Sequence, residues 1–392
     1  MNLAQHLESS RNGGCPKRPT AGDVETMLKG ASAGHPLSRP QASALLGVCP
    51  GEDPRSFDLI LRASERLKEE CFHGRVFAIV PVYVSSVCQE HCIYCNYRAG
   101  NKDKEITRLR LSDSQLRSEL EFLVRKGYRV LELVYATDPF ISVEDIARHI
   151  TIAKQVLAQF GNGAVGLNAR PYSVEQYRVL REAGLDFAVL WQETYDLASY
   201  AILHPGGTEK SDYQFRLQAP ERMIEAGLAH IGLGVLSGLS DWRTDWELLM
   251  GHVQYLQEAF VGTLKNVILG LPRLKRAAGA ALQTTEFIPD DREQLLAIAA
   301  FNLFMPAALP FVNTRESWEQ CLRIAAGGGT LFTLNCKTIP GGYSHENIGY
   351  QFPTFDFAVE QYRGGLETHG LTPAFDWSFD HMAKESLLAE QH

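Results

Sequence analysis

The feature that most constrains the fold of this chain is a recurring unit: an amphipathic helix, a glycine and a short run of Val, Ile and Leu. The clearest copy begins with the capping box SDSQ (112–115), continues through Leu116, Leu120 and Leu123 on one helical face, and ends near Gly127. The run RVLELVYA follows at once and has the composition of a strand. Alternating helices and strands favour a sheet of parallel strands.

The unit returns along most of the chain. Helical copies occur in SVEDIARHITIAKQVLAQFG, SVEQYRVLREAG and APERMIEAG, each followed by an apolar run. Besides RVLELVYA, the expected strands are RVFAIVPVYV (75–84), GAVGLNA (163–169), LDFAVLW (185–191), LAHIGLGVL (228–236), NVILG (266–270), LPFVNT (309–314) and TLFTL (330–334). Eight strands, mostly separated by helical segments, predict an α/β fold: a closed (β/α)8 barrel of the TIM type over residues 76–344. An open doubly wound sheet is the alternative.

The expected barrel is flanked by two further regions. Residues 1–75 are more polar and are broken by Pro and Gly, with helical patches such as DVETMLKGA and ASALLGV. We expect an N-terminal extension of short helices there. Residues 345–392 are rich in aromatic side chains, and we expect a C-terminal extension that packs across one end of the barrel.

Composition excludes several classes of protein. Of the 392 residues, 45% are hydrophobic and 21% charged, which suits a soluble globule with a large core. The formal net charge of −8 disfavours nucleic-acid binding, which needs clustered Lys and Arg. No run reaches the eighteen or so apolar residues of a membrane-spanning helix, and the start MNLAQHLESSRNGG has no apolar signal core. We expect a cytoplasmic protein with no membrane or nucleic-acid partner.

Three of the eight cysteines are packed into the stretch CQEHCIYC, directly after the first expected strand. In a barrel, loops at the carboxyl ends of strands build the active site. Cys88, Cys92 and Cys95 can bind three irons of a 4Fe-4S cluster and leave the fourth iron open to a small molecule. The alternative is a structural zinc site completed by His91 or His73, although no second cysteine pair of zinc spacing occurs.

The C-x3-C-x2-C spacing, with an aromatic residue before the third cysteine, resembles the radical S-adenosylmethionine (radical SAM) superfamily. This resemblance implies that the open iron binds the amino and carboxylate groups of S-adenosylmethionine. It also implies that an electron from the reduced cluster cleaves this cofactor to methionine and a 5'-deoxyadenosyl radical. Tyr94 would then lie near the adenine, and an electron donor such as flavodoxin or ferredoxin would reduce the cluster.

Five later segments narrow the resemblance: WQETYD, RLQAPERMIEAGLAHIGLGVLSGLSDW, LPRLKRAAGA, NTRES and KTIPGGY. Together they resemble the aromatic amino acid lyase branch. This branch contains 2-iminoacetate synthase of thiamine biosynthesis, the tyrosine lyase of FeFe-hydrogenase maturation and the tryptophan lyase of thiopeptide biosynthesis. The resemblance covers roughly residues 76–385.

Four residues in these segments are candidates for binding the cofactor. Glu193 can accept hydrogen bonds from the ribose or amino group, and Arg216 can pair with the carboxylate through its forked guanidinium. Gly232 and Gly234 would allow close approach of the adenine. The structural alternatives are an exposed loop carboxylate, a cation on a helix surface, and glycines that relieve crowding between barrel strands.

Two residues are candidates for binding the substrate. Arg315 follows the seventh expected strand, and in the resembling lyases the arginine of this segment clamps the substrate carboxylate. An unpaired arginine inside a barrel is costly, so either an anionic ligand or Glu316 must compensate it. Tyr83 resembles a family tyrosine that contacts the substrate, and a tyrosine of the barrel core is the alternative.

The resemblance implies that the deoxyadenosyl radical takes a hydrogen atom from the amino nitrogen of an aromatic amino acid, and tyrosine is the expected one. Cleavage of the Cα–Cβ bond then yields 2-iminoacetate (dehydroglycine) and p-cresol. Thiamine thiazole biosynthesis is the expected pathway, with a thiazole synthase as a partner. Alternatives are a tryptophan lyase, a paralogue that acts on another amino acid, and a non-catalytic iron-sulfur scaffold.

The sequence also departs from the family in ways that point to a shifted substrate. Where the family has a Gly-Glu pair that contacts S-adenosylmethionine, this chain has Ala136 and Thr137, and Asp138 is a possible substitute. The loop after Cys95 differs from the thiamine enzymes, and Cys336 stands where serine is common. No second cysteine cluster follows Cys336, which disfavours the hydrogenase-maturation role.

Overall fold

Eight parallel strands form a closed barrel in the computed structural model, which describes residues 3–11, 18–32, 34–103, 106–161, 163–355 and 359–379. The strands are β1 (Arg75–Ser85), β2 (Val130–Tyr135), β3 (Ala164–Asn168), β4 (Phe187–Glu193), β5 (His230–Val235), β6 (Asn266–Gly270), β7 (Leu309–Asn313) and β8 (Leu331–Thr333). They pair in chain order, and β1 pairs with both β2 and β8. The predicted (β/α)8 barrel is confirmed, and the open sheet is wrong.

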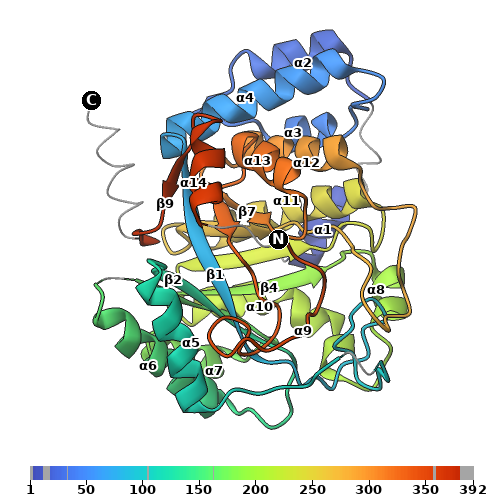
Figure 1. Ribbon diagram of the computed structural model, residues 1–392. Helices are drawn as coiled ribbons and strands as arrows, with labels where there is room; N and C mark the ends of the chain where they lie inside the picture. Colours follow the sequence, from blue (N-terminus) through green and yellow to red (C-terminus); the bar gives the residue numbers. More distant parts are fainter. Residues whose placement is uncertain are drawn as a thin grey trace.

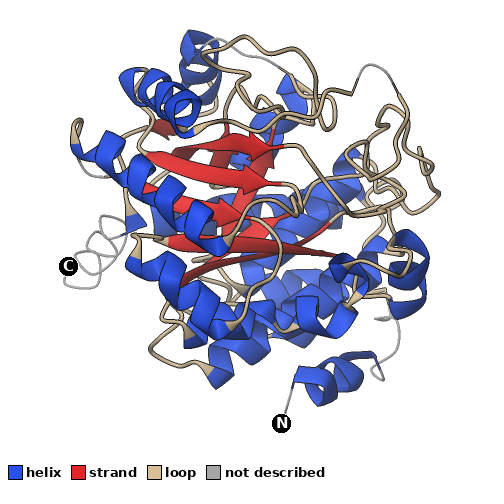
Figure 2. Ribbon diagram, turned by 90° about the horizontal axis from the view of Figure 1, so that it is seen from below, coloured by secondary structure: helices blue, strands red, loops and turns tan. Residues whose placement is uncertain are grey.

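Helices surround this barrel, as Figure 2 shows with the strands at the centre. The helices after the first strand are α5 (Asp113–Arg125), α6 (Val143–Ala158), α7 (Val174–Glu182), α8 (Leu197–Leu203), η1 (Glu209–Ser211), α9 (Tyr213–Leu217), α10 (Ala219–Glu225), α11 (Trp242–Ala259), α12 (Asp291–Phe304), α13 (Trp318–Ala326) and α14 (Val359–Glu367). Capping boxes at Ser112, Ser142 and Ser173 begin three of them. After α5, Gly127 takes a φ of 101°, which allows the chain to turn from helix to strand.

The N-terminal extension consists of α1 (Leu3–Arg11), α2 (Ala21–Leu28), α3 (Arg39–Leu45) and α4 (Pro54–Phe72). Of these, α4 has 19 residues, so the expectation of short helices alone is wrong. Its buried face packs on α12, while α1 packs on α11 (Figure 1). No helix among the described ranges is both long and apolar enough to span a membrane.

Side chains along β1 alternate between two surroundings. Val76, Ala78 and Val80 face the helices, whereas Phe77 and Ile79 point into the barrel and join a second apolar cluster. This cluster fills the half of the barrel nearest the start of the strands. Further along β1, the inward positions no longer belong to the cluster but line a cavity. The barrel is thus closed at one end and hollow at the other.

The C-terminal extension reaches both ends of the barrel, not one as expected. At the closed end, β9 (Thr372–Ala374) pairs with the start of β1, and Trp377 Nε1 donates a hydrogen bond to the carbonyl of Ala78 at 2.8 Å. At the hollow end, Gln351 bonds to side chains of the cavity. Residues 356–358 and 380–392 of this extension, and 1–2, 12–17 and 33 of the N-terminal one, lie outside the described residues.

Candidate active site

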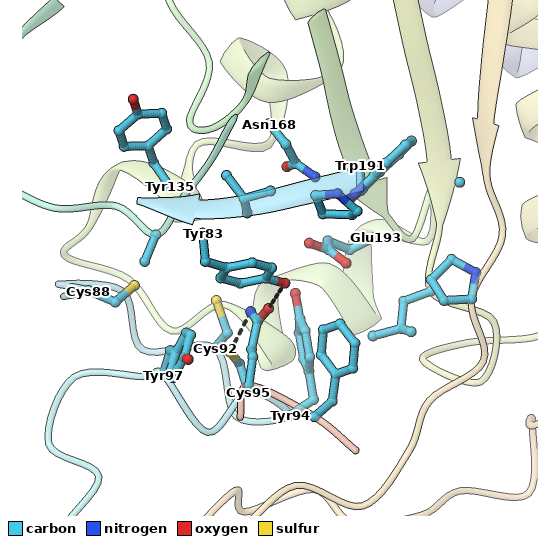
Figure 3. A pocket seen from close by; sticks show the side chains of 18 of the residues that line it. Tyr83, Cys88, Cys92, Tyr94, Cys95, Tyr97, Tyr135, Asn168, Trp191 and Glu193 are labelled. Atoms are coloured by element: carbon cyan, nitrogen blue, oxygen red, sulfur yellow. Dashed lines mark hydrogen bonds between the residues drawn. The ribbon is translucent and has the colours of Figure 1, made fainter. Parts of the chain in front are cut away.

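The cavity opens at the carboxyl ends of the strands. Its volume is about 1510 Å³ when the space open to solvent at its mouth is included. Figure 3 shows aromatic side chains, Glu193 and the cysteines around it. Nine of the predicted site residues line it: Tyr83, Cys88, Cys92, Tyr94, Cys95, Thr137, Glu193, Arg216 and Arg315. The other three, Asp138, Gly232 and Gly234, are not among its lining residues. Residues from far apart in the chain therefore meet where a barrel places its active site.

The cysteines lie on a long loop between β1 and α5 whose two ends are joined. Ser85 forms an antiparallel bridge with Arg110, and the backbone N–H of Leu109 donates to Ser86 Oγ at 2.8 Å. Further along the loop, Tyr97 Oη donates a hydrogen bond to the carbonyl of Thr338. These bonds fix the loop, whose described residues form no helix.

Asp138 belongs to the base of this loop and not to the cavity. Its carboxylate accepts bonds from Arg110 Nε and Nη2 at 2.8 and 2.7 Å, from Ser85 Oγ at 2.6 Å and from the backbone N–H of Phe140 at 3.0 Å. Burial would raise the pKa of Asp138, but these donors outweigh it and lower that pKa. Its oxygens are already used in holding the loop, whereas Thr137 lines the cavity beside it.

The thiols of the loop fit a cluster better than a single metal ion. Burial raises the pKa of Cys88 to about 11 and that of Cys92 to about 12, so only a bound metal would hold these side chains as thiolates at neutral pH. Among the described residues, no three Cys, His, Asp or Glu side chains are placed to hold one metal ion. A 4Fe-4S cluster binds its three cysteines through three different irons, so it does not need them to meet at one point.

Neither of the two histidines considered as zinc ligands lines the cavity. His91 is exposed and does not line the cavity. His73 follows the last residue of α4 and precedes β1, at the closed end of the barrel. Neither histidine is therefore placed to complete a zinc site with the thiols.

Tyr94 presents its ring to the cavity while its hydroxyl group is held from behind. Tyr94 Oη lies 2.9 Å from His204 Nε2, and His204 Nδ1 lies 3.0 Å from the carbonyl of Tyr200. Burial lowers the pKa of His204 to about 3, so this imidazole is neutral. Its Nδ1 proton then donates to the carbonyl, and Nε2 accepts the proton of Tyr94. The ring itself lines the cavity, with Lys210 Nζ over it at 5.7 Å from its centre.

Glu193 lies between two buried cations. Lys210 Nζ donates to Glu193 Oε1 at 2.7 Å, and Arg216 Nη2 is 3.7 Å from the same oxygen. Burial would raise the pKa of Glu193, but Lys210 and Arg216 outweigh it and lower it to about 2. Arg216 also donates two bonds to the carbonyl of Trp191. Glu90 also lines the cavity here, and its Oε2 accepts a hydrogen bond from the backbone N–H of Lys210 at 3.2 Å, so the two cations lie beside two carboxylates.

The backbone itself aims Glu193 at the cavity. Its φ is 75°, a conformation that residues with a side chain rarely adopt. The pairing of β4 with β5 shifts register between Trp191 and Glu193, as at a β-bulge. Such local strain is typical of functional sites. The alternative of an exposed loop carboxylate is wrong.

Replacing Lys210 with Met is expected to destabilise the fold by about 1–3 kcal/mol, because Glu193 would lose a charge-assisted hydrogen bond and its nearest cation and would keep only Arg216, 3.7 Å away. A carboxylate whose folded pKa is lowered stabilises the protein above its ordinary pKa of 4.5, and that contribution is lost as the pH falls towards 2. The loss in the variant should therefore be complete at pH 7. Urea unfolding at pH 7 measures it, and adding Glu193→Gln should restore most of the stability. If Lys210→Met alone is as stable as the wild type, Lys210 does not stabilise the charge of Glu193.

The two glycines of β5 serve packing. A Cβ on Gly232 would lie 2.3 Å from Val189 Cγ1, and one on Gly234 would lie 2.0 Å from the carbonyl oxygen of Gly270. Both contacts are far shorter than side chains tolerate. The alternative, glycines that relieve crowding between strands, describes both positions.

Arg315 has no anionic partner among the described residues. Its Nε is buried without a hydrogen-bond partner, and its guanidinium carbon lies 3.2 Å from the centre of the Phe352 ring. Burial lowers the pKa of Arg315. Glu316 does not compensate it, because Arg273 and Lys275 bind that carboxylate, Arg273 Nε at 3.0 Å and Lys275 Nζ at 2.8 Å. Its place in the cavity therefore suits an exogenous anion as the partner of Arg315.

Tyr83 is joined to the cysteine loop through Gln351. Tyr83 Oη donates to Gln351 Oε1 at 2.8 Å, and Gln351 Nε2 donates to Cys95 Sγ at 3.5 Å, the two dashed lines in Figure 3. Sequence reasoning missed Gln351 and Lys210. Gln351 stands in an irregular segment and Lys210 in the three-residue helix η1, and in neither does a period mark a buried position. A single polar residue in such a segment gives no signal of its own.

The sequence of this chain is similar to proteins of known family. The family model described as the radical SAM superfamily matches residues 82–273. The 2-iminoacetate synthase of Escherichia coli (strain K12) is 31% identical over 366 residues, covering 91% of this chain and 91% of that protein.

Two solved structures have a similar fold. The crystal structure of HydG, a maturase of the FeFe-hydrogenase, aligns with a TM-score of 0.84 and 27% identity over 95% of this chain and 79% of that one. Methylornithine synthase (PylB) aligns with a TM-score of 0.71 and 19% identity over 92% of this chain and 99% of that one, a likeness of fold alone.

Proposed function

Because this chain belongs to the radical SAM superfamily, we propose that it cleaves the Cα–Cβ bond of tyrosine to 2-iminoacetate and p-cresol. It is a radical SAM enzyme related to 2-iminoacetate synthase, and its cofactors are a 4Fe-4S cluster and S-adenosylmethionine. Together these cofactors supply a 5'-deoxyadenosyl radical that abstracts a hydrogen atom. The protein's own task is to bind and orient the substrate.

Residues from four parts of the cavity wall would hold the cofactors. Cys88, Cys92 and Cys95 would bind three irons. Glu193, fixed by Lys210, would accept hydrogen bonds from S-adenosylmethionine, and Arg216 would attract its carboxylate. Tyr94 would stack on the adenine, since its hydroxyl group is turned towards His204 and its ring towards the cavity. Thr137 lines the same region and would offer a hydroxyl group there.

The single observation that carries the substrate proposal is the unpaired guanidinium of Arg315 in the cavity that the three cysteines line. An amino acid carboxylate matches its forked donors. Tyr83, 6% exposed, lies in the same cavity and would contact the substrate. A carboxylate held at Arg315 leaves the rest of the amino acid free to extend into the barrel.

The walls of the cavity suit an aromatic side chain. Trp191 and Phe311 line it with their rings at 80° and 5.8 Å apart, and Phe352 lies against Arg315. Aromatic pairs of this geometry bind a further ring by its face or edge. Gln351 and Phe352, from the C-terminal extension, help to keep water from the radical chemistry.

The test is product analysis on anaerobically reconstituted protein given dithionite and S-adenosylmethionine, with and without tyrosine or tryptophan. We expect 5'-deoxyadenosine to form in proportion to p-cresol and to 2-iminoacetate, which hydrolyses to glyoxylate, when tyrosine is added. Stimulation by tryptophan alone would make the protein a tryptophan lyase. If neither tyrosine nor tryptophan stimulates cleavage of S-adenosylmethionine but another amino acid does, the protein is a paralogue with another substrate.

No cofactor cleavage with any amino acid would instead favour an iron-sulfur scaffold.

If tyrosine is the substrate, we propose thiamine thiazole biosynthesis as the pathway, with a thiazole synthase that takes up the 2-iminoacetate and a flavodoxin or ferredoxin that supplies the electron. The same assay with flavodoxin and its reductase in place of dithionite tests whether such a protein can supply the electron.

A further inference from the structure

A buried carboxyl group that the proposed chemistry does not use lies deep in the cavity. Glu132 is 2% exposed and lines the cavity from β2. Asn168 Nδ2, from the neighbouring strand β3, donates a hydrogen bond to Glu132 Oε1 at 2.7 Å. This is its single hydrogen bond within the described part of the chain, and no salt bridge reaches it there. One of its oxygens is therefore available to a ligand.

The surroundings of Glu132 are unusual for a carboxyl group. Burial raises its pKa to about 7, and the bond from Asn168 only partly opposes this. Among the residues that the structure describes, no cation contributes to the pKa of Glu132, whereas Glu193 in the same cavity has two. An isolated carboxyl group inside a barrel is expensive unless something donates to it. Apolar packing alone gives no reason for one here.

The strand register places Glu132 at the floor of the cavity. Going along β2, the inward positions are Val130, which belongs to the apolar cluster, and then Glu132 and Val134, which line the cavity. Val134 pairs with Tyr83, so Glu132 is one inward position, roughly 7 Å, deeper than Tyr83. Arg315, by contrast, lies two residues beyond the end of β7, near the rim.

A ligand held by its carboxylate at Arg315 would point its other end towards Glu132. We propose that Glu132, positioned by Asn168, is a specificity residue that accepts a hydrogen bond from a donor at the far end of the substrate's aromatic ring, a phenol O–H or an indole N–H. This inference rests on the proposed function, because it takes an aromatic amino acid as the substrate.

The chemistry of the floor favours ligands with such a donor over those without. A ring without a donor would bury the free oxygen of Glu132 against carbon, and this leaves a polar group unsatisfied. A site built to bond a substrate hydroxyl group rejects the analogue that lacks it more strongly than an apolar pocket rejects a missing methylene. Trp191 and Phe311 line the cavity too, and they would contact the ring itself whether or not it carries the donor.

The test measures binding to the reconstituted holoenzyme by calorimetry, with S-adenosylmethionine present and no reductant, so that no turnover occurs. The ligands are two matched pairs, tyrosine with phenylalanine and tryptophan with 1-methyltryptophan. For the wild type we expect at least one donor-bearing member to bind about 10- to 100-fold more tightly than its partner. In Glu132→Leu this ratio should fall to about one to three. Glu132→Gln, whose amide oxygen still accepts a bond, should give an intermediate ratio.

Glu182→Gln, an exposed glutamate on α7, is the matched control and should keep the wild-type ratio. Iron content and circular dichroism show that each variant is folded and loaded. A wild-type ratio near one, or an unchanged ratio in Glu132→Leu, overturns this inference while leaving tyrosine cleavage intact. Failure of all four amino acids to bind overturns the proposed function together with it.

Discussion

Cys92→Ala should lose all iron-dependent activity, the largest effect that we expect from any single substitution. Cys92 is the most buried of the three cysteines, and without a metal its thiol is neutral because burial raises its pKa to about 12. Removing it leaves two protein ligands where a stable cluster with one open iron needs three. Anaerobic reconstitution should then give protein with little iron, and formation of 5'-deoxyadenosine should drop to the assay background.

Cys49→Ala is the control, since Cys49 is part-buried between α3 and α4 and does not line the cavity. It should keep the wild-type iron content and the wild-type rate of cofactor cleavage. A Cys92→Ala protein that retains both the cluster and cofactor cleavage would show that the cysteine loop does not hold the reactive centre.

Arg315→Met should weaken amino acid binding and yet not weaken the fold. Losing a charge-assisted, forked contact with a carboxylate costs about 2–5 kcal/mol, a rise in Kd or KM of roughly 30- to several-thousand-fold. The ligand-free protein should unfold with the same free energy or one about 1–2 kcal/mol higher, because no anion pairs with Arg315 among the described residues and Met fills a similar volume. Binding and stability therefore change in opposite directions.

Calorimetric titration with tyrosine and urea unfolding measure the two effects. Arg178→Met, on the exposed surface of α7, is the control for loss of an arginine and should change neither by a measurable amount. A large loss of stability in Arg315→Met with unchanged binding would mean that Arg315 supports the fold and does not bind substrate.

Most of the barrel could be predicted from the sequence because each strand is an apolar run bounded by clear signals. The run NVILG matches β6 at both ends, and Ser112 caps α5 as its SDSQ motif predicts. The long helix α4 was missed because its charged residues obscure its apolar face, although Pro54 and Asp53 give it a good start. Tertiary packing on α12, which no local pattern reveals, stabilises it.

The site was predictable where short motifs carry the chemistry. Cys88, Cys92, Cys95 and Arg315 could be found because spacing or strand ends mark them. Asp138 could not be ruled out from the sequence, since only the fold brings Arg110, 28 residues away in the chain, to its carboxylate.

Other site residues carry no local signal at all. Lys210 lines the cavity from the three-residue helix η1 and Gln351 from an irregular segment, and their positions depend on how the barrel closes. Glu132 lies inside an apolar strand, where the sequence pattern predicts its place but not that no described cation acts on it. Burial and pairing are properties of the folded chain.

Electron paramagnetic resonance of the reduced, anaerobically reconstituted protein tests the role of the three cysteines most directly. We expect the spectrum of a reduced 4Fe-4S cluster, and we expect it to change when S-adenosylmethionine is added, because the iron that has no cysteine ligand would bind it. Protein that contains zinc and gives no such spectrum, or a cluster spectrum that stays the same with the cofactor present, would contradict the site described for Cys88, Cys92 and Cys95.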